Sequence, residues 1–373
     1  MMNKTEQQLF ALLRSGLWGS PVDADLFSDI VDWEAMLKMA AMQTVTGIVY
    51  DGIDKLPVDK QPPIPLMRKL YQTVMRIEQS HELLNKQLAK IVSKLQMEGI
   101  NPVLLKGQGV AQNYPNPLRR QCGDIDLYVG KENCEKAVEI LLGTGASPEN
   151  KTKKKSPKHE SFYLRGVTIE LHFLVEKLHN PFANAEFQRW TQKHLRGNEL
   201  QTWNLNGVNI SLPPVNFNAL YIFNHAYHHF IAGGIGLRQL CDWAIYLYIF
   251  HGHIDRQELM KDLKALGLLK PWQVFGCIVV EELGLPKEDF PFYTEKYKGD
   301  SLLVLSKILQ TGNFGYYNTE YGKHPAGYLA GKLHSLYIRQ KWIGGCLSIF
   351  PKESLLFYIY YWGNGISNIL KGR

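Results

Sequence analysis

Cysteine is scarce in this sequence, and its few copies lie far apart. The chain has 5 cysteines among 373 residues, and no two of them form a CxxC pair. This pattern indicates neither a disulfide framework nor a zinc site, so we expect reduced thiols in a cytoplasmic protein.

A strong charge of one sign is also missing, because the net charge is only +7. An excess of that size permits an anionic substrate such as a nucleotide or RNA but does not require one.

Long apolar runs are absent as well. The first ten residues, MMNKTEQQLF, lack the apolar core of a signal peptide. The longest uncharged run, from Ser354 to Leu370, is interrupted by Gly and Asn and is too polar for a membrane span. We therefore expect a cytoplasmic protein without a transmembrane segment. The aromatic residues of this run indicate helix packing, with a face for a membrane surface or a partner as the alternative.

The distribution of apolar residues predicts an α+β architecture in three parts. Apolar residues recur every three to four positions in much of residues 1–99, which predicts a helical N-terminal portion. Residues 100–212 predict a small α/β unit with a mixed sheet, and residues 213–373 a largely helical C-terminal half. The expected helices are 3–15, one after the N-cap Asp32, 66–98, 132–142, 216–231, 237–250, 256–266, 271–283, 301–310, 327–341 and 351–370.

A lysine-rich segment interrupts the α/β unit. Residues 147–158, SPENKTKKKSPK, have the composition of a solvated loop. The alternative is a loop that folds over an anionic substrate. The next residues alternate apolar and polar side chains and predict a hairpin of strands at 159–164 and 167–173.

The stretch from Val103 to Val129 is the part of the sequence that points most directly to chemistry. Its first three residues predict a buried strand, which Lys106-Gly107 ends. A second strand follows Gly123 and carries Asp124-Ile125-Asp126. Because alternate side chains of a strand share a face, Asp124 and Asp126 point the same way. Two adjacent carboxylates repel each other, so the pattern indicates a cation between them, and Mg²⁺ prefers carboxylate oxygen.

A third carboxylate lies on a later strand. The alternation of the second hairpin strand puts Glu170 and His172 on one face, with Thr168. Three carboxylates that converge from adjacent strands can hold two divalent metals about 3.5–4 Å apart, the arrangement used for in-line displacement at phosphorus. The alternative is that Glu170 faces solvent. His172 is expected to support the carboxylates, to contact substrate or to have a purely structural role.

Two polar groups in the C-terminal half allow more than one interpretation. His225, His228 and His229 lie three and four residues apart on one expected helix. Without an HExxH pattern or an evident fourth ligand, we expect them to contact the α/β unit or a nucleotide rather than a metal. Arg238 and Asp242 are spaced i, i+4, which indicates a salt bridge within a helix. The alternative is that Arg238 faces a triphosphate.

Several of these motifs occur together in one known family. They are Leu105-Lys106-Gly107, Tyr114-Pro115, Arg120, Gly123-Asp124-Ile125-Asp126-Leu127, Glu170-Leu171-His172, the three histidines, and Arg238 with Asp242. The set resembles a bacterial family of uncharacterised nucleotidyltransferases, within the nucleotidyltransferase superfamily of the DNA polymerase β type. The resemblance covers roughly residues 30–250.

The resemblance implies a nucleotidyltransferase-type sheet and a set of catalytic roles. Asp124, Asp126 and Glu170 would be the catalytic residues and the ligands of Mg²⁺ or Mn²⁺, with Glu170 also the base for the acceptor hydroxyl. Gly107 would let the triphosphate approach the backbone, while Lys106 and Arg120 would contact phosphate oxygens. The full set of expected nucleotide-binding residues is Lys106, Gly107, Arg120, Gly123, His172 and Arg238.

One position departs from the wider superfamily. Its turn usually reads Gly-Ser or Gly-Gly, whereas this chain has Lys106-Gly107-Gln108. The serine hydroxyl that binds phosphate in the superfamily is therefore missing here. Its role would fall to Lys106 or to backbone N–H groups.

The expected function is metal-dependent transfer of a nucleoside monophosphate from an NTP to a hydroxyl acceptor, with release of pyrophosphate. The acceptor is unidentified, and we rank a small molecule or a protein above RNA because aromatic and basic residues are not interleaved. A catalytically degenerate module that binds nucleotide or protein is the alternative; the intact carboxylates disfavour it and the missing serine favours it. Phosphoester hydrolysis at the same carboxylates is a third possibility. The oligomeric state is not indicated.

Overall fold

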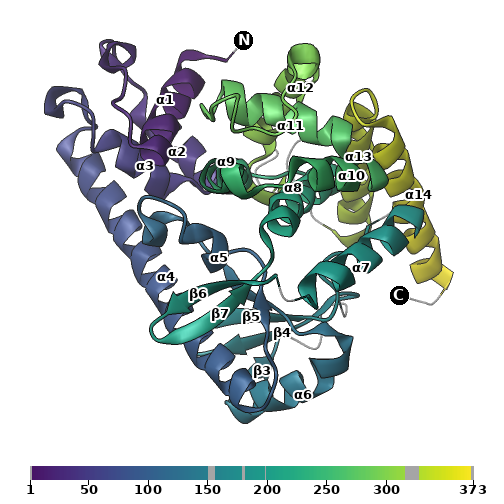
Figure 1. Ribbon diagram of the computed structural model, residues 1–373. Helices are drawn as coiled ribbons and strands as arrows, with labels where there is room; N and C mark the ends of the chain where they lie inside the picture. The colour runs from purple at the N-terminus through teal and green to yellow at the C-terminus, as the bar shows by residue number, and fades with distance from the viewer. Residues whose placement is uncertain (1, 150–155, 179–180, 198, 316–326, 371–373) are drawn as a thin grey trace.

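A mixed β-sheet occupies one end of the molecule, and helices form the rest (Figure 1). The structure is a computed structural model, and it describes residues 2–149, 156–178, 181–197, 199–315 and 327–370. The expected combination of a mixed sheet with N-terminal and C-terminal helices is confirmed. Among the helices of these ranges, none combines the length and the apolar character that crossing a bilayer requires.

The sheet has 7 strands in the order β3-β4-β5-β2-β1-β7-β6. β2 runs parallel to β5, and β1 runs parallel to β7, while the other neighbours are antiparallel. Alternate residues such as Ile125, Leu127 and Ile169 are fully buried and form its core. The strands are β1 (Val103–Leu104), β2 (Asp124–Tyr128), β3 (Ser147–Pro148), β4 (His159–Leu164), β5 (Val167–His172), β6 (Gln201–Leu205) and β7 (Val208–Leu212).

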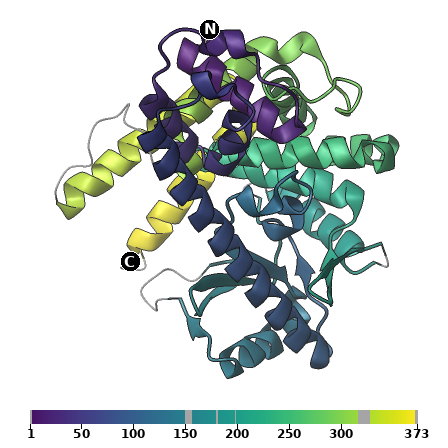
Figure 2. The ribbon, with the colours of Figure 1, turned by 90° about the vertical axis from the view of Figure 1, so that its left-hand side faces the viewer.

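One long helix, α4 (Ile64–Met97), joins the sheet to the helical part, as Figure 2 shows. Pro65 lies in its first turn, where the missing N–H is not needed, and Gly99 follows its end with a φ of +80°. Leu70 and Val74 pack in the core of the helical part. The second half of α4, from Leu84 to Leu95, packs against the sheet. The helix therefore contributes to both hydrophobic cores.

The N-terminal helices are α1 (Lys4–Trp18), α2 (Trp33–Met42) and α3 (Thr46–Ile53). The side chain of Asp32 accepts a hydrogen bond from the backbone N–H of Ala35, so the expected N-cap is confirmed. α1 and α3 approach closely at two glycines. A Cβ on Gly16 would lie 2.1 Å from the carbonyl oxygen of Ile48, and one on Gly52 would lie 2.2 Å from that of Leu12. Only glycine permits this contact.

The helices of the C-terminal half pack on these N-terminal helices in one core. Its centre is aromatic and includes Phe223, Trp243, Trp272 and Phe275, all nearly or fully buried. The expected helices of this half are confirmed, with ends shifted by a few residues. They are α8 (Val215–Ala232), α9 (Leu237–Phe250), α10 (Arg256–Ala265), α11 (Leu269–Glu281), α12 (Lys298–Thr311), α13 (Tyr328–Leu347) and α14 (Pro351–Leu370).

Several elements were not anticipated from the sequence. These are α3, α7 (Pro181–Leu195), and the hairpin of β6 and β7. In contrast, α6 (Gly130–Gly143) and a short helical piece after Lys106-Gly107, here α5 (Gln108–Ala111), agree with the sequence prediction. In the lysine-rich segment, Ser147–Pro148 form β3, and residues 150–155 lie outside the described residues. The interpretation of that segment as a solvated loop or a substrate cover stays a prediction, as does the division of the chain into three domains.

The two faces of α4 allow a matched test of the sheet core. Leu84 is 3% exposed and its neighbour Leu83 is 37% exposed. We expect Leu84→Ala to lower the free energy of unfolding by roughly 2–4 kcal/mol, because it leaves a cavity against the sheet. Leu83→Ala should cost less than half as much. Thermal and urea unfolding monitored by circular dichroism measure both, and equal losses would contradict this packing.

Candidate active site

The turn after β1 carries the first of the expected site residues. The backbone N–H of Leu105 donates to the carbonyl of Asp126 at 3.1 Å, which ties the turn to β2. Gly107 has a φ of +58°, in the left-handed region that favours glycine. This turn places Lys106 Nζ 3.2 Å from Asp126 Oδ1 and 3.4 Å from His225 Nε2.

Parallel pairing of β2 with β5 brings the carboxylates together. In this register Asp126 lies opposite Glu170, and Asp124 lies opposite Thr168. Paired residues on neighbouring strands project from the same face of a sheet. One carboxylate oxygen from each of Asp124, Asp126 and Glu170 lies within 4.8 Å of the other two. The three residues that were selected from strand alternation therefore form one cluster, although their catalytic role stays a prediction.

Asp126 is the most deeply buried of the three, with 1% of its surface exposed. Its Oδ1 accepts a hydrogen bond from His172 Nε2 at 2.9 Å and lies beside Lys106. Burial by itself would raise the pKa of Asp126, but Lys106 and His172 outweigh it and hold that pKa below its usual value. Its other oxygen, Oδ2, is buried with no hydrogen-bond partner in the described parts of the chain.

Asp124 and Glu170 complete the cluster at its partly exposed side. Repulsion from the Asp126 carboxylate, followed by burial, raises the pKa of Asp124 to about 6. Glu170 Oε2 lies 3.2 Å from His172 Nε2 and 3.2 Å from His159 Nδ1 of β4. His172 is 1% exposed, so it supports two carboxylates from within the protein. His172 thus supports the carboxylates, and its expected contact with substrate stays a prediction.

The donor set of this cluster fits a hard divalent cation. All three groups offer carboxylate oxygen, which Mg²⁺ and Mn²⁺ prefer. A cation among them would relieve the repulsion between Asp124 and Asp126. It would also give the buried Asp126 Oδ2 the partner that the neighbouring side chains do not supply. The residues present thus suit the metal that the sequence led us to expect.

Arg120 has a different partner from the one expected of a phosphate ligand. It is 4% exposed, and its Nε and Nη2 lie 3.0 and 2.5 Å from the two carboxylate oxygens of Asp242 on α9. Tyr114 donates its hydroxyl hydrogen to the same carboxylate at 2.7 Å. The guanidinium is therefore engaged in a buried ion pair. Arg120 joins the segment before β2 to α9 and also borders the cavity beside Asp124, so its expected contact with phosphate stays a prediction beside this positioning role.

Arg238 is consequently not held by Asp242 as the i, i+4 spacing suggested. Its Nη1 donates to the carbonyl of Gln121 at 2.6 Å, and its Nε is buried without a hydrogen-bond partner among the described residues. The side chain lines a cavity of about 280 Å³, together with Lys106, Gly107 and Asp124. Gly123 also borders this cavity, and an added Cβ there would meet no atom within 4 Å. The geometry favours the interpretation in which Arg238 faces a ligand.

The histidines of α8 meet a carboxylate that sequence reasoning missed. Glu176 is 2% exposed and accepts hydrogen bonds from Lys158 Nζ at 2.9 and 3.1 Å. Its oxygens lie 3.5 Å from His225 Nδ1 and 4.0 Å from His228 Nε2. Burial alone would raise the pKa of Glu176, but Lys158 and the histidines hold it well below its usual value. The sequence did contain a signal for Glu176, because this glutamate directly follows the apolar residues Leu174 and Val175.

This second cluster has ligand atoms but an unfavourable charge for a metal. Single atoms of Glu176, His225 and His229 lie within 4.8 Å of one another. However, Lys158 already neutralises Glu176, and Lys106 lies beside His225. Burial and then Lys106 lower the pKa of His225 to about 4, so His225 is neutral near pH 7. The cluster of three carboxylates is therefore the better fit for a divalent cation, and Glu176 fixes the histidines against the α/β unit.

The fold and this site together define a mixed α/β protein with three convergent carboxylates beside a lysine-glycine turn. The profile of a family described as uncharacterised nucleotidyltransferase matches residues 29–283, and the chain belongs to this family. The match includes every residue of the site described above. No curated protein matches the chain. Among solved structures, this chain is similar to an antigenic nucleotidyltransferase-like protein from Paracoccidioides brasiliensis. The two share 15% sequence identity and align with a TM-score of 0.34, over 54% of this chain and 92% of that one.

The buried pair of Arg120 and Asp242 makes a prediction about stability. Asp242→Asn would leave the guanidinium buried without its countercharge, so we expect it to destabilise the protein by about 3 kcal/mol. The matched control is Asp29→Asn, which removes the exposed partner of Lys4 and should leave the stability unchanged. Urea unfolding of the two variants measures the difference. Equal stability of Asp242→Asn and the wild type would contradict the role given to Arg120.

Proposed function

We propose that this protein is a metal-dependent nucleotidyltransferase, which moves a nucleoside monophosphate from an NTP to a hydroxyl acceptor and releases pyrophosphate. The convergence of Asp124, Asp126 and Glu170 on one face of the sheet carries this proposal. Family membership supports nucleotidyl transfer in general terms. The metal, the mechanism and the acceptor belong to the proposal.

Mg²⁺ or Mn²⁺ held by the three carboxylates would neutralise triphosphate charge and activate the acceptor hydroxyl. Asp126 is fixed in place for this purpose by His172 and Lys106, which occupy its Oδ1 and leave its Oδ2 available. Asp124 borders the cavity and has the more open position. In this arrangement Asp126 is rigidly held, whereas Asp124 has access to the substrate.

Lys106 and Arg238 are the residues we assign to the triphosphate. Both border the cavity of about 280 Å³ beside Asp124, and both carry positive charge. A guanidinium can bind two phosphate oxygens at once, whereas an ammonium acts as a compact charge. Gly107 lets the backbone pass close to the substrate at the same point. These groups would bind the phosphate oxygens in place of the serine hydroxyl that the turn lacks.

Glu170 is the candidate base for the acceptor hydroxyl. It lies at the partly exposed side of the cluster, next to His159 and His172. Those two histidines hold its carboxylate in one orientation. The acceptor would therefore approach from the β4 side of the sheet. We rank a small molecule or a protein hydroxyl above an RNA end.

Calorimetry with NTPs tests the nucleotide and metal parts of the proposal together. We expect at least one NTP to bind in the presence of Mg²⁺ and to lose most of its affinity when the metal is chelated. The double variant Asp124→Asn/Asp126→Asn should bind NTP at least tenfold more weakly, because the metal ligands are lost. Asp29→Asn is the control with the same change in an exposed residue. Metal-independent binding, or equal binding by the double variant, would contradict the proposal.

Product analysis separates transfer from the two alternatives. With an NTP labelled at the α-phosphate, transfer yields pyrophosphate and a labelled acceptor. Hydrolysis needs no acceptor and yields a free nucleoside monophosphate or diphosphate. A degenerate module binds the NTP and returns it unchanged across a broad panel of hydroxyl acceptors.

A further inference from the structure

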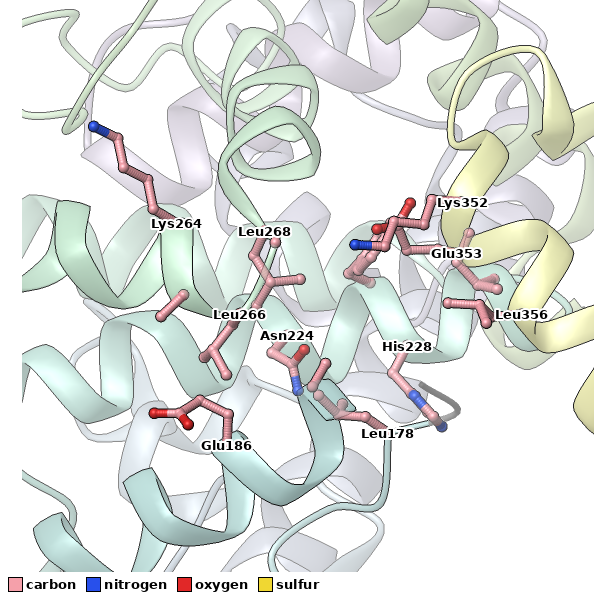
Figure 3. Close-up of a pocket in the computed structure, with 15 residues that line it drawn as sticks. Leu178, Glu186, Asn224, His228, Lys264, Leu266, Leu268, Lys352, Glu353 and Leu356 are labelled. Atoms are coloured by element: carbon pink, nitrogen blue, oxygen red, sulfur yellow. The ribbon is translucent and has the colours of Figure 1, made fainter. Parts of the chain in front are cut away.

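A second cavity borders α8 on a face next to the one that borders the carboxylate site. It has a volume of about 460 Å³ and is bordered by α7, α8, the turn between α10 and α11, and the start of α14 (Figure 3). Small-molecule sites have volumes of about 300–1,000 Å³. Much of the wall is apolar, with contributions from Leu178, Ile231, Leu266, Leu268 and Leu356. The size and the lining are those of a binding site.

Two buried polar atoms at this cavity have no partner among the described residues. They are Nδ2 of Asn224 and the hydroxyl oxygen of Tyr227. Asn224 is 1% exposed and Tyr227 is 4% exposed, and both line the cavity from α8. Buried polar groups in proteins nearly always form hydrogen bonds. Both atoms are buried at the cavity, so a small side-chain rotation would bring either group to an oxygen atom of a bound molecule, which would accept its hydrogen bond.

The charges around the cavity balance. Glu186 and Glu353 offset Lys264 and Lys352, so the wall has no net charge from these four residues. Burial lowers the pKa of His228, the remaining titratable residue beside Tyr227, and the ring is therefore neutral near pH 7. A strongly charged ligand such as a nucleotide triphosphate has no counterpart here. The wall suits a neutral molecule.

The cavity is separate from the carboxylate site. On α8, Tyr221 and His225 border the cavity beside Asp124, whereas Asn224, His228 and Ile231 border this one. Successive residues are rotated by about 100° around a helix, which places the two sets on neighbouring faces of α8. The residues that line one cavity do not line the other.

From these observations we propose that this cavity is a second small-molecule site, which binds a neutral, mainly apolar molecule that carries a hydroxyl or carbonyl oxygen. The apolar wall excludes water from the body of the ligand, and Asn224 and Tyr227 bind its oxygen. The site is independent of the proposed transfer reaction, so it stands even if the carboxylates serve another chemistry.

2-Naphthol and naphthalene are matched probes, since they differ by one hydroxyl group. Ligand-observed NMR with the full-length protein should show saturable binding of 2-naphthol, roughly tenfold tighter than that of naphthalene because of the added hydrogen bond. Tyr227→Phe should reduce this preference and leave the affinity for naphthalene unchanged. Tyr163→Phe, at a tyrosine that is 52% exposed, is the control. Absence of 2-naphthol binding, or a preference that Tyr227→Phe does not alter, would overturn the proposal.

A pair of alanines on α7 tests the location. Ala183 lines the cavity, and Ala185 is exposed on the same helix outside it. Ala183→Trp should fill the cavity and weaken 2-naphthol binding at least tenfold, whereas Ala185→Trp should leave it unchanged. The variant Asp126→Asn should bind 2-naphthol as the wild type does, because the two sites are separate. Equal binding by both tryptophan variants, or loss of binding in Asp126→Asn, would contradict a second site in this cavity.

Discussion

Repulsion among carboxylates on a buried sheet face is the constraint on which the rest of this structure depends. The parallel register of β2 and β5 places Asp126 opposite Glu170, and strand alternation adds Asp124 to the same face. Three carboxylates this close cannot all remain charged without positive partners. Lys106, His172 and His159 supply part of that compensation. A divalent cation would supply the rest, and the raised pKa of Asp124 indicates where compensation is incomplete.

Two buried networks hold the elements around this face in position. Arg120, Asp242 and Tyr114 connect the segment between α5 and β2 with α9. Glu176 connects the segment after β5 with Lys158 and with the histidines of α8. Each network places a charged group in the interior with its countercharge, which is costly unless the partners stay together. The sheet and the helical part are therefore tied at both ends of the carboxylate cluster.

Local patterns predicted β1, β2, β4, β5 and most helices, and with them the face on which the carboxylates lie. Alternation in Asp124-Ile125-Asp126 and in Glu170-Leu171-His172 was enough to select the three carboxylates, although Glu170 lies on a separate, later strand. Helical periodicity likewise predicted α4 and the helices from α8 onward. These signals are local, because they depend on the spacing of apolar residues within one element.

The partners of the buried charges were not predictable in the same way. Arg120 and Asp242 are 122 positions apart, and the i, i+4 spacing of Arg238 and Asp242 suggested a different pair. The spacing of residues around Glu176 does not indicate that its carboxylate contacts Lys158 and the histidines of α8. The hairpin of β6 and β7 was missed although its signal is local, because Val208–Leu212 alternates apolar and polar residues and Asn206-Gly207 is a common hairpin turn. The helix α7 was missed as well. Long-range pairing depends on tertiary packing, which a single sequence does not display.

Anomalous diffraction from crystals grown with Mn²⁺ and a non-hydrolysable NTP analogue tests the central claim most directly. The account predicts Mn²⁺ peaks bounded by Asp124, Asp126 and Glu170, with the triphosphate beside Lys106 and Arg238. Peaks at Glu176 and the α8 histidines, or a triphosphate bound without metal at the three carboxylates, would contradict it.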